Sequence, residues 1–212
     1  MTSLPQLALD HVVYAAPNLE AAIESLADRL GVRASPGGRH LGLGTRNALL
    51  ALQDERYIEV IGPDPAQPDP PGARPFGIDG LETPRLVTWA VRESQLDERI
   101  VSARKAGFDP GNAIAVSRKT PAGETISWRL SFSPALRGDG LVPFLIDWGD
   151  VPHPSATAAS GCSLVSMRAE HPDPPAVRRD LAALGAALEV SRADAPALIL
   201  QLSTPKGPVE LR

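Results

Sequence analysis

Cysteine is almost absent from this sequence, because Cys162 is the only one among 212 residues. An intramolecular disulfide is therefore excluded, and so is a structural zinc site made of several thiolates. Cys162 has no recognisable partner in the sequence, and no Gly-x-Ser-x-Gly motif is present. The sequence thus gives no support for catalysis by a nucleophilic side chain.

Basic clusters and long apolar runs are missing as well. The net charge of −4 and the pI near 5.6 argue against a nucleic-acid-binding protein, which would carry a clustered basic face. No apolar run approaches the roughly 20 residues that span a bilayer, and residues 1–10 lack the basic segment and apolar core of a secretory signal. We therefore expect a cytoplasmic protein that binds neither nucleic acid nor membrane.

The residues that are present suit a globular chain. Hydrophobic residues make up 43% and charged residues 22%, which is the usual balance for soluble domains. The length allows one substantial core or two small ones. Many of the 22 prolines fall between segments with periodic apolar residues, so they separate the predicted elements rather than interrupting them.

The first unit has the order strand, helix and three strands. Leu9–Tyr14 is predicted to be a strand, and Asn18 is a good N-cap for the helix that follows. Apolar residues then recur at helical spacing up to Leu30. The predicted elements after the helix are a turn at Pro36–His40, two strands or one strand bent at residues 44–47 within Leu41–Leu52, and a strand at Tyr57–Ile61.

The same order begins twice more. In each unit a glycine stops the helix, and Gly31, Gly107 and Gly185 lie 76 and 78 residues apart. Ser94 and Asp97 are predicted to form a capping box at the start of the second helix. This period is too long for a solenoid of small repeats and fits repeated βαβββ modules. The further predicted strands are 86–91, 113–116, 125–132, 141–148, 163–168, 188–191, 197–202 and 209–211.

These units predict a chain of five segments. Residues 1–62 form a first βαβββ module, residues 86–150 a second, and residues 162–212 a third, βαβββ-like module. A proline-rich connector at residues 63–85 and a small, polar linker at residues 151–161 separate them. The connector has no apolar periodicity, so we expect it to be extended on the surface, where it can lie across a cavity mouth.

Two side chains stand out because each interrupts an apolar strand. His11 lies in the middle of Leu9–Tyr14, and Glu59 lies in the middle of Tyr57–Ile61. Because residues alternate between strand faces and both faces are apolar here, both side chains are expected to be shielded from water. A shielded imidazole or carboxylate is costly unless it is paired. The two residues are therefore either a site that contacts a metal or substrate, or a buried hydrogen bond that only orients the strands.

Other polar residues are candidates for the same site. His40 follows two glycines and is either a third metal ligand or proton-transfer group, or a turn residue. Arg46 and Asn47 either anchor an anionic or carbonyl-bearing substrate, or are solvated residues of a bend. Asp147 and Trp148 either line the cavity and contact the substrate, or Asp147 caps a turn and Trp148 belongs to the core.

The remaining tryptophans and histidines have simpler interpretations. Trp89 and Trp128 are expected in the core, since aromatic side chains dominate core burial. His153 and His171 each precede a proline in a predicted loop, so both are expected on the surface. None of these four residues enters the predicted site.

Four segments carry a family resemblance: Leu9–Ala15, Gly37–Asn47, Tyr57–Ile61 and Phe144–Trp148. With them the sequence resembles the vicinal oxygen chelate superfamily, and within it the glyoxalase-like domain proteins. The resemblance covers nearly the whole chain as an order of modules and is sharp in the first module. It implies an α+β fold in which paired βαβββ modules form an open barrel around a cavity, as in glyoxalase and bleomycin-resistance proteins, with an additional C-terminal module here.

The resemblance also implies a divalent metal, held by a His from the first strand of a module and a Glu from its last strand. His11 and Glu59 match these positions, His40 is expected as a further ligand, and the metal is Mn, Fe, Ni, Co or Zn. In this hypothesis the metal polarises a carbonyl while Glu59 or His40 moves a proton. Lyase, isomerase and dioxygenase chemistry on a small, oxygen-rich metabolite all occur in such folds, and the fold does not choose between them.

The second module departs from this pattern, which favours an alternative: a metal-free protein of the same fold that sequesters a small molecule. Leu86, Val87 and Thr88 stand where its first-strand His would be, and Asp147 replaces the closing Glu. The third module offers only Glu210. Because three modules cannot pair off within one chain, the third is expected either to cap the others or to pair with a second protomer in a homodimer. A third hypothesis is a degenerate scaffold whose extra module serves oligomerisation.

Overall fold

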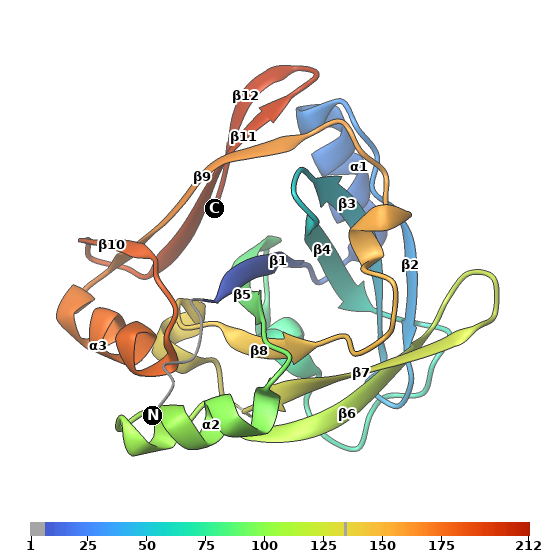
Figure 1. The fold of residues 1–212 in the computed structure, drawn as a ribbon. Helices are drawn as coiled ribbons and strands as arrows, with labels where there is room; N and C mark the ends of the chain where they lie inside the picture. The colour runs from blue at the N-terminus through green and yellow to red at the C-terminus, as the bar shows by residue number, and fades with distance from the viewer. Residues whose placement is uncertain (1–6, 134) are drawn as a thin grey trace.

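The fold is described by a computed structural model that covers residues 7–133 and 135–212. Its elements follow the order βαβββ three times along the chain (Figure 1). The strands are β1 (Ala8–Ala15), β2 (Ser35–His40), β3 (Thr45–Leu52), β4 (Arg56–Pro63), β5 (Arg85–Arg92), β6 (Asn112–Lys119), β7 (Thr125–Phe132), β8 (Phe144–Asp147), β9 (Ser163–His171), β10 (Glu189–Arg192), β11 (Ala197–Thr204) and β12 (Gly207–Leu211). The helices are α1 (Leu19–Leu30), α2 (Leu96–Lys105) and α3 (Pro174–Leu184), with 3-10 helices η1 (Pro75–Gly80), η2 (Arg137–Gly140) and η3 (Pro154–Ala156).

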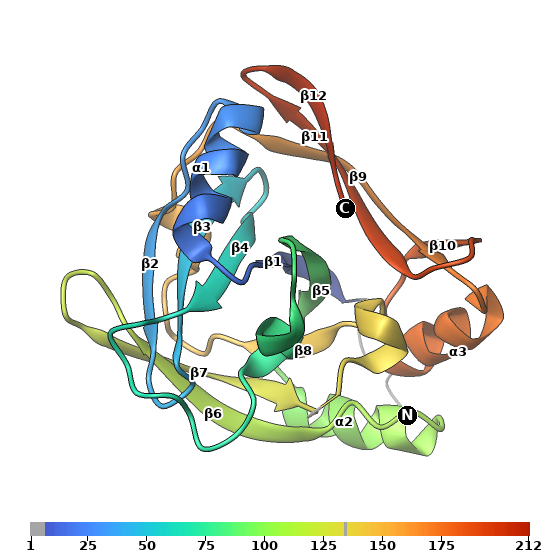
Figure 2. The same cartoon turned by 180° about the vertical axis from the view of Figure 1, so that it is seen from behind.

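The first two βαβββ units together form one closed barrel with the strand order β1-β4-β3-β2-β6-β7-β8-β5. Two junctions join the units: β1 pairs antiparallel with β5, and β2 pairs with β6 through His40 and Arg118. Helices α1 and α2 lie on the outside of this barrel (Figures 1 and 2). The predicted α+β fold of paired modules is confirmed, and the barrel is closed where the resemblance implied an open one.

The third unit forms a separate sheet with the strand order β10-β9-β11-β12. This sheet lies along the outside of the barrel, and α3 lies beside α2 (Figure 2). Leu200 and Leu211 of the sheet share a buried core with Val12 and Trp89 of the barrel wall. Within this chain the third unit therefore covers the other two, because burying the apolar outer face of β1 and β5 is favourable.

The helix ends predicted at Asn18, Gly31 and Gly185 are confirmed. Asn18 accepts a hydrogen bond from Ala21 N at 3.1 Å, and Gly31 ends the helix with φ 77°. Asp173 caps α3 in the same way, and Gly185 ends it with φ 85°. No helix within residues 7–133 and 135–212 is long and apolar enough to cross a membrane.

Two local predictions in the second unit are wrong. Helix α2 begins after Gln95 and has no side-chain cap at that residue, so Ser94 forms no capping box; the carboxylate of Glu93 instead accepts from Gln95 N at 2.8 Å. The strand predicted at 141–148 is also shorter, since β8 covers residues 144–147 only. The carbonyl of Leu141 instead accepts a hydrogen bond from the indole of Trp89 at 2.9 Å.

The segment Pro36–His40 is a strand rather than the predicted turn. It lies within β2, which pairs with β3 on one side and with β6 on the other, and the turn comes later, at residues 41–44. Gly37 is required here because an added Cβ would lie 2.3 Å from Asn47 Oδ1 and 2.6 Å from Arg118 Nη1. Pairing on both sides thus overrides the turn propensity of glycine and proline, and it places His40 in the barrel wall.

The proline-rich connector does more than cross the surface. Its 3-10 helix η1 places Ile78, which is 1% exposed, against Val13, Ile61 and Val87 of the barrel. Burial of this apolar side chain stabilises the connector in its position against the barrel. The connector therefore contributes part of the apolar core of the barrel.

Candidate functional site

Four polar side chains of the first unit meet inside the barrel, and each comes from a different strand. His11 lies on β1, Glu59 on β4, Asn47 on β3 and His40 on β2, and all four are buried. These strands are consecutive neighbours in the barrel. Because alternate residues of a strand face the interior, the register brings the four side chains to one face, where we call them the central cluster.

Glu59 is the middle of the central cluster. Its Oε2 lies 3.7 Å from His11 Nε2, and its Oε1 lies 3.7 Å from His40 Nε2. Asn47 Nδ2 donates a hydrogen bond to Glu59 Oε1 at 2.6 Å. The structure thus brings together the three residues for which the sequence predicted metal or proton chemistry, with two imidazoles directed at one carboxylate.

A β-bulge at Asp10 sets the orientation of His11. Leu9 pairs with Val91 and His11 with Ala90, so Asp10 is the extra residue in β1. Neighbouring side chains of a regular strand face opposite sides, yet Asp10 Oδ1 lies 2.7 Å from His11 Nδ1. The sequence reasoning missed Asp10 because simple alternation placed it on the other face.

Asp10 is completely buried, and its Oδ2 atom has three further partners. His153 Nε2 lies 3.0 Å away, the indole of Trp148 donates at 3.1 Å, and Arg92 Nε forms an ion pair at 3.0 Å. The prediction that His153 lies on the surface is wrong, because its side chain is 11% exposed and contacts this carboxylate. His171 is likewise 13% exposed and paired with Asp139.

The ionisation of Asp10 fixes the tautomer of His11. Burial raises the pKa of Asp10, but the hydrogen bonds with His11 and His153 lower it by more than burial raises it. The pKa of Asp10 therefore lies well below its usual range. The ionised carboxylate accepts the proton of His11 Nδ1. With Nδ1 bonded to this carboxylate, His11 presents its Nε2 to Glu59 at 3.7 Å.

His40 is held in a similar way from the other side. Its Nδ1 lies 3.0 Å from Thr45 Oγ1, and Asn47 Nδ2 lies 3.4 Å from its Nε2. Because Asn47 Nδ2 is a donor, Nε2 accepts and the proton of His40 is on Nδ1. Burial lowers the pKa of His40 despite the opposing charge of Glu59, so the ring is neutral.

This lowered pKa predicts a pH dependence of stability. Unfolded His40 titrates near 6.5, so below that pH the unfolded chain binds a proton that the folded chain refuses. The free energy of unfolding should therefore fall as the pH drops below about 6.5. His40→Gln should reduce this fall in urea titrations between pH 5.5 and 7.5. His171→Gln, on the strand β9, should leave it in place; an unchanged slope in His40→Gln would contradict the assignment.

Arg118 is a functional candidate that the sequence reasoning missed. It is 6% exposed, it stands directly opposite His40 across the β2–β6 pairing, and its Nη1 donates to Asn47 Oδ1 at 3.2 Å. Burial lowers its pKa. In the sequence, Arg118 is one of two adjacent basic residues in a polar stretch, and only the junction of the two units brings it next to the central cluster.

Arg46 lies on the outer side of the barrel wall, where it pairs with Glu20 of α1 at 3.0 Å. It does line a cavity of about 410 Å³ together with Asn47, and Arg39 and Lys119 line the same cavity. Arg46 and Asn47 thus border one cavity, although they are oriented by different partners. Asn47 is the one residue of the central cluster that lines this cavity among the described residues.

The central cluster has the right donor atoms for a divalent metal, namely two imidazole nitrogens and a carboxylate. The spacing, however, does not match. Among the described residues, no three His, Cys, Asp or Glu side chains are placed so that they could hold one metal ion. One oxygen of Glu59 already accepts from Asn47, and the guanidinium of Arg118 acts on the same carboxylate. As arranged, the residues do not fit a bound metal.

Comparison with known proteins places this fold. The family model described as a glyoxalase-like domain matches residues 9–185. The chain belongs to the glyoxalase-like domain family. The resemblance to the vicinal oxygen chelate superfamily is thereby confirmed.

Several solved structures are similar to this glyoxalase-like protein. A hypothetical protein from Staphylococcus aureus is similar with a TM-score of 0.63 and 12% identity, over 90% of this chain and 88% of that one. Methylmalonyl-CoA epimerase from Mycobacterium tuberculosis has a TM-score of 0.45 and 24% identity, over 74% and 97%. Hypothetical protein BH1468 from Bacillus halodurans has a TM-score of 0.45 and 15% identity, over 69% and 97%. No curated protein matches the chain.

The second unit of this glyoxalase-like protein lacks a matching half-site. Glu59 pairs with Val13, two residues after His11, and Phe144 pairs with Ala90, two residues after Thr88. Thr88 and Phe144 are therefore the counterparts of His11 and Glu59. The polar site is built from the first unit, and the second unit supplies apolar side chains and Arg118.

Asp147 and Trp148, the remaining predicted contacts, have protein partners. Asp147 Oδ1 accepts from Gly149 N at 3.0 Å and so caps a turn, and the indole of Trp148 donates to Asp10. Glu210 lies in the C-terminal sheet, where it pairs with Arg212 and accepts from Gln201 at 2.6 Å. None of the three is brought to the central cluster.

Proposed function

We propose that this protein is an enzyme that moves a proton on a small, oxygen-rich metabolite, with Glu59 as the base. The observation that carries the proposal is the approach of two imidazole nitrogens to one buried carboxylate, each at 3.7 Å. Both nitrogens lie close enough to Glu59 for a small movement to allow proton exchange with it, and burial, which lowers the pKa of His40, keeps that ring neutral. A buried group poised to bind and release a proton is what isomerases and lyases require.

Each member of the cluster has a role in this proposal. Glu59 takes a proton from a carbon next to a carbonyl group; the C–H bond breaks, and its electron pair moves into the enolate. His40, neutral because burial lowers its pKa, accepts or returns the proton. The hydrogen bond from Asn47 holds Glu59 in place, and Asp10 holds the ring of His11. The enolate forms in a site closed to water, where fixed donors act strongly.

Metal binding by His11, His40 and Glu59 stays a prediction. The spacing of these side chains does not hold an ion, and the proposed proton transfer runs through the side chains themselves. The cytoplasmic location and the homodimer expected from the sequence also stay predictions. The same holds for Arg46, Asn47, Asp147 and Trp148 as substrate contacts.

Binding without chemistry is the second candidate. Thr88 and Phe144 stand where a second His and Glu would complete a symmetric site, and this supports a cavity that sequesters a small molecule. In that case a ligand raises the melting temperature, and the variant Glu59→Gln responds to it as the wild type does.

The experiment is proton exchange followed by NMR in D2O. Purified, untagged protein is incubated with a panel of 2-oxo, 2-hydroxy and malonate-type acids, with and without EDTA, and its metal content is measured. Exchange at the carbon next to the carbonyl that survives EDTA supports the proposal. Exchange lost with EDTA and restored by Mn, Fe, Ni, Co or Zn supports the metal-dependent prediction instead. Ligand binding without any exchange supports the second candidate.

A further inference from the structure

We propose that Arg118 and Trp128 form an anion subsite, which binds a carboxylate of the substrate beside Glu59. This rests on the proposed function, because the subsite is useful to chemistry only if Glu59 acts on the same molecule. Arg118 lies on β6, and Trp128 lies on the adjacent strand β7, paired with Val116. Residues 116 and 118 face the same side, so both side chains point to the barrel interior.

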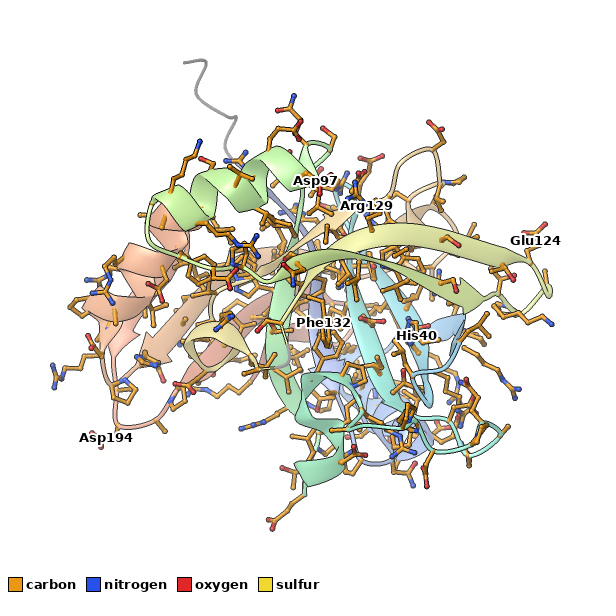
Figure 3. All side chains as sticks on the ribbon, turned by 90° about the horizontal axis from the view of Figure 1, so that it is seen from below. His40, Asp97, Glu124, Arg129, Phe132 and Asp194 are labelled. Carbon is orange, nitrogen blue, oxygen red and sulfur yellow. The ribbon has the colours of Figure 1, made fainter. Side chains whose placement is uncertain are left out.

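The neighbours of the two side chains confirm that orientation. Arg118 contacts Asn47 of the central cluster. The ring of Trp128 lies edge-on to His40, with ring centroids 6.2 Å apart, and against Trp148 at 5.1 Å. Figure 3 shows His40 beneath the β6–β7 hairpin, whose tip is marked by Glu124. Arg118 and Trp128 therefore form the wall of the barrel that faces His40.

Both side chains carry buried donors without acceptors. Arg118 Nε and Trp128 Nε1 are enclosed and have no hydrogen-bond partner, and the two residues are 6% and 8% exposed. Within the described ranges Arg118 forms no ion pair; its single hydrogen bond goes to the neutral amide of Asn47. Buried donors are nearly always satisfied in folded proteins, so two on neighbouring strands that face the same interior indicate that an acceptor is supplied from outside.

Charge leads to the same conclusion. His40 opposite Arg118 is neutral, and Glu59 acts on the guanidinium from a distance without pairing with it. Burying a cation without an anionic partner costs free energy of folding, and yet the fold buries the guanidinium of Arg118. An arginine fork binds a planar carboxylate through two parallel hydrogen bonds. The free donors are few, which suits the two oxygens of a carboxylate better than the larger oxygen set of a phosphate.

The test is ligand binding by thermal unfolding and calorimetry, with malonate as the probe, and with neutral malonamide and inorganic phosphate as comparisons. Malonate should raise the melting temperature of the wild type, and malonamide should not. In Arg118→Met, the affinity for malonate should fall by about 10- to 100-fold, since hydrogen bonds to charged groups are lost. Without ligand, Arg118→Met should melt as high as the wild type or higher, because an uncompensated buried charge is gone.

Arg137→Met is the matched control. Arg137 Nε is also buried without a partner, but it lies on η2, away from the central cluster, so malonate binding should be retained. The proposal is overturned if malonate has no effect on the wild type, if malonamide acts equally, or if Arg118→Met keeps the response. A lower melting temperature of ligand-free Arg118→Met would also overturn it, because Arg118 would then be structural. If phosphate raises the melting temperature more than malonate does, and Arg118→Met abolishes that rise, the proposal of a carboxylate as the ligand is overturned.

Failure of this inference can be told apart from failure of the proposed function. Glu59→Gln removes the base but leaves Arg118 and Trp128 in place, so it should still bind malonate. If proton exchange depends on Glu59 but Arg118→Met binds malonate as the wild type does, the subsite is rejected and the proposed function is kept. Malonate binding through Arg118 with no exchange on any acid rejects the enzyme and keeps the subsite.

Discussion

Glu59→Gln is expected to slow proton exchange on any substrate of this protein by about 100- to 10,000-fold, the usual contribution of a general base. The amide has nearly the same shape as the carboxylate and can still accept the hydrogen bond from Asn47, which measures 2.6 Å in the structure. It cannot take a proton at neutral pH. The measurement is the rate of deuterium incorporation by NMR, with substrate affinity measured in parallel.

The control for this variant is Glu124→Gln, at the exposed tip of the β6–β7 hairpin (Figure 3). It makes the same chemical change far from the central cluster and should leave the exchange rate unaltered. A loss in Glu59→Gln that appears only as weaker substrate binding, with kcat unchanged, would show that Glu59 binds rather than acts as a base. A rate equal to the wild type would contradict the proposal outright.

Asp10→Ala is expected to lower the free energy of unfolding by about 3–5 kcal/mol, the range found when one partner of a buried charge pair is removed. Asp10 is 0% exposed, and its removal leaves Arg92, Trp148 and His153 without their shared acceptor. His11 also loses the group that fixes its tautomer. Urea unfolding followed by circular dichroism measures the change.

Asp97→Ala is the matched control, because it also breaks an aspartate–arginine pair. Asp97 accepts from Arg129 Nη2 at 2.9 Å through both oxygens, but its side chain is 65% exposed (Figure 3). An exposed pair contributes less than about 1 kcal/mol. If Asp10→Ala costs no more than this control, Asp10 does not organise the site. The stabilisation by Asp10 should also disappear as the pH falls below the ordinary carboxyl pKa of 3.8, because its pKa in the folded state is lowered.

The sequence alone predicted β1, α1 and β4 of the first unit and the repeat of the βαβββ order. These features depend on local signals, such as the Asn18 cap, the helix-ending Gly31 and the apolar strands around His11 and Glu59. Local signals act within a few residues, so a single chain displays them. The prediction failed at Pro36–His40, where pairing with two neighbouring strands outweighs the propensity for a turn.

What the sequence determined by itself is therefore the fold class and the pair of polar residues that interrupt apolar strands. Which groups surround that pair was decided by the tertiary structure. A bulge turns Asp10 toward His11, the barrel junction brings Arg118 opposite His40, and a loop returns His153 to Asp10 from 143 positions away. The physical reason is that alternation fixes a side chain relative to its own strand, whereas register, bulges and barrel closure fix it relative to other strands.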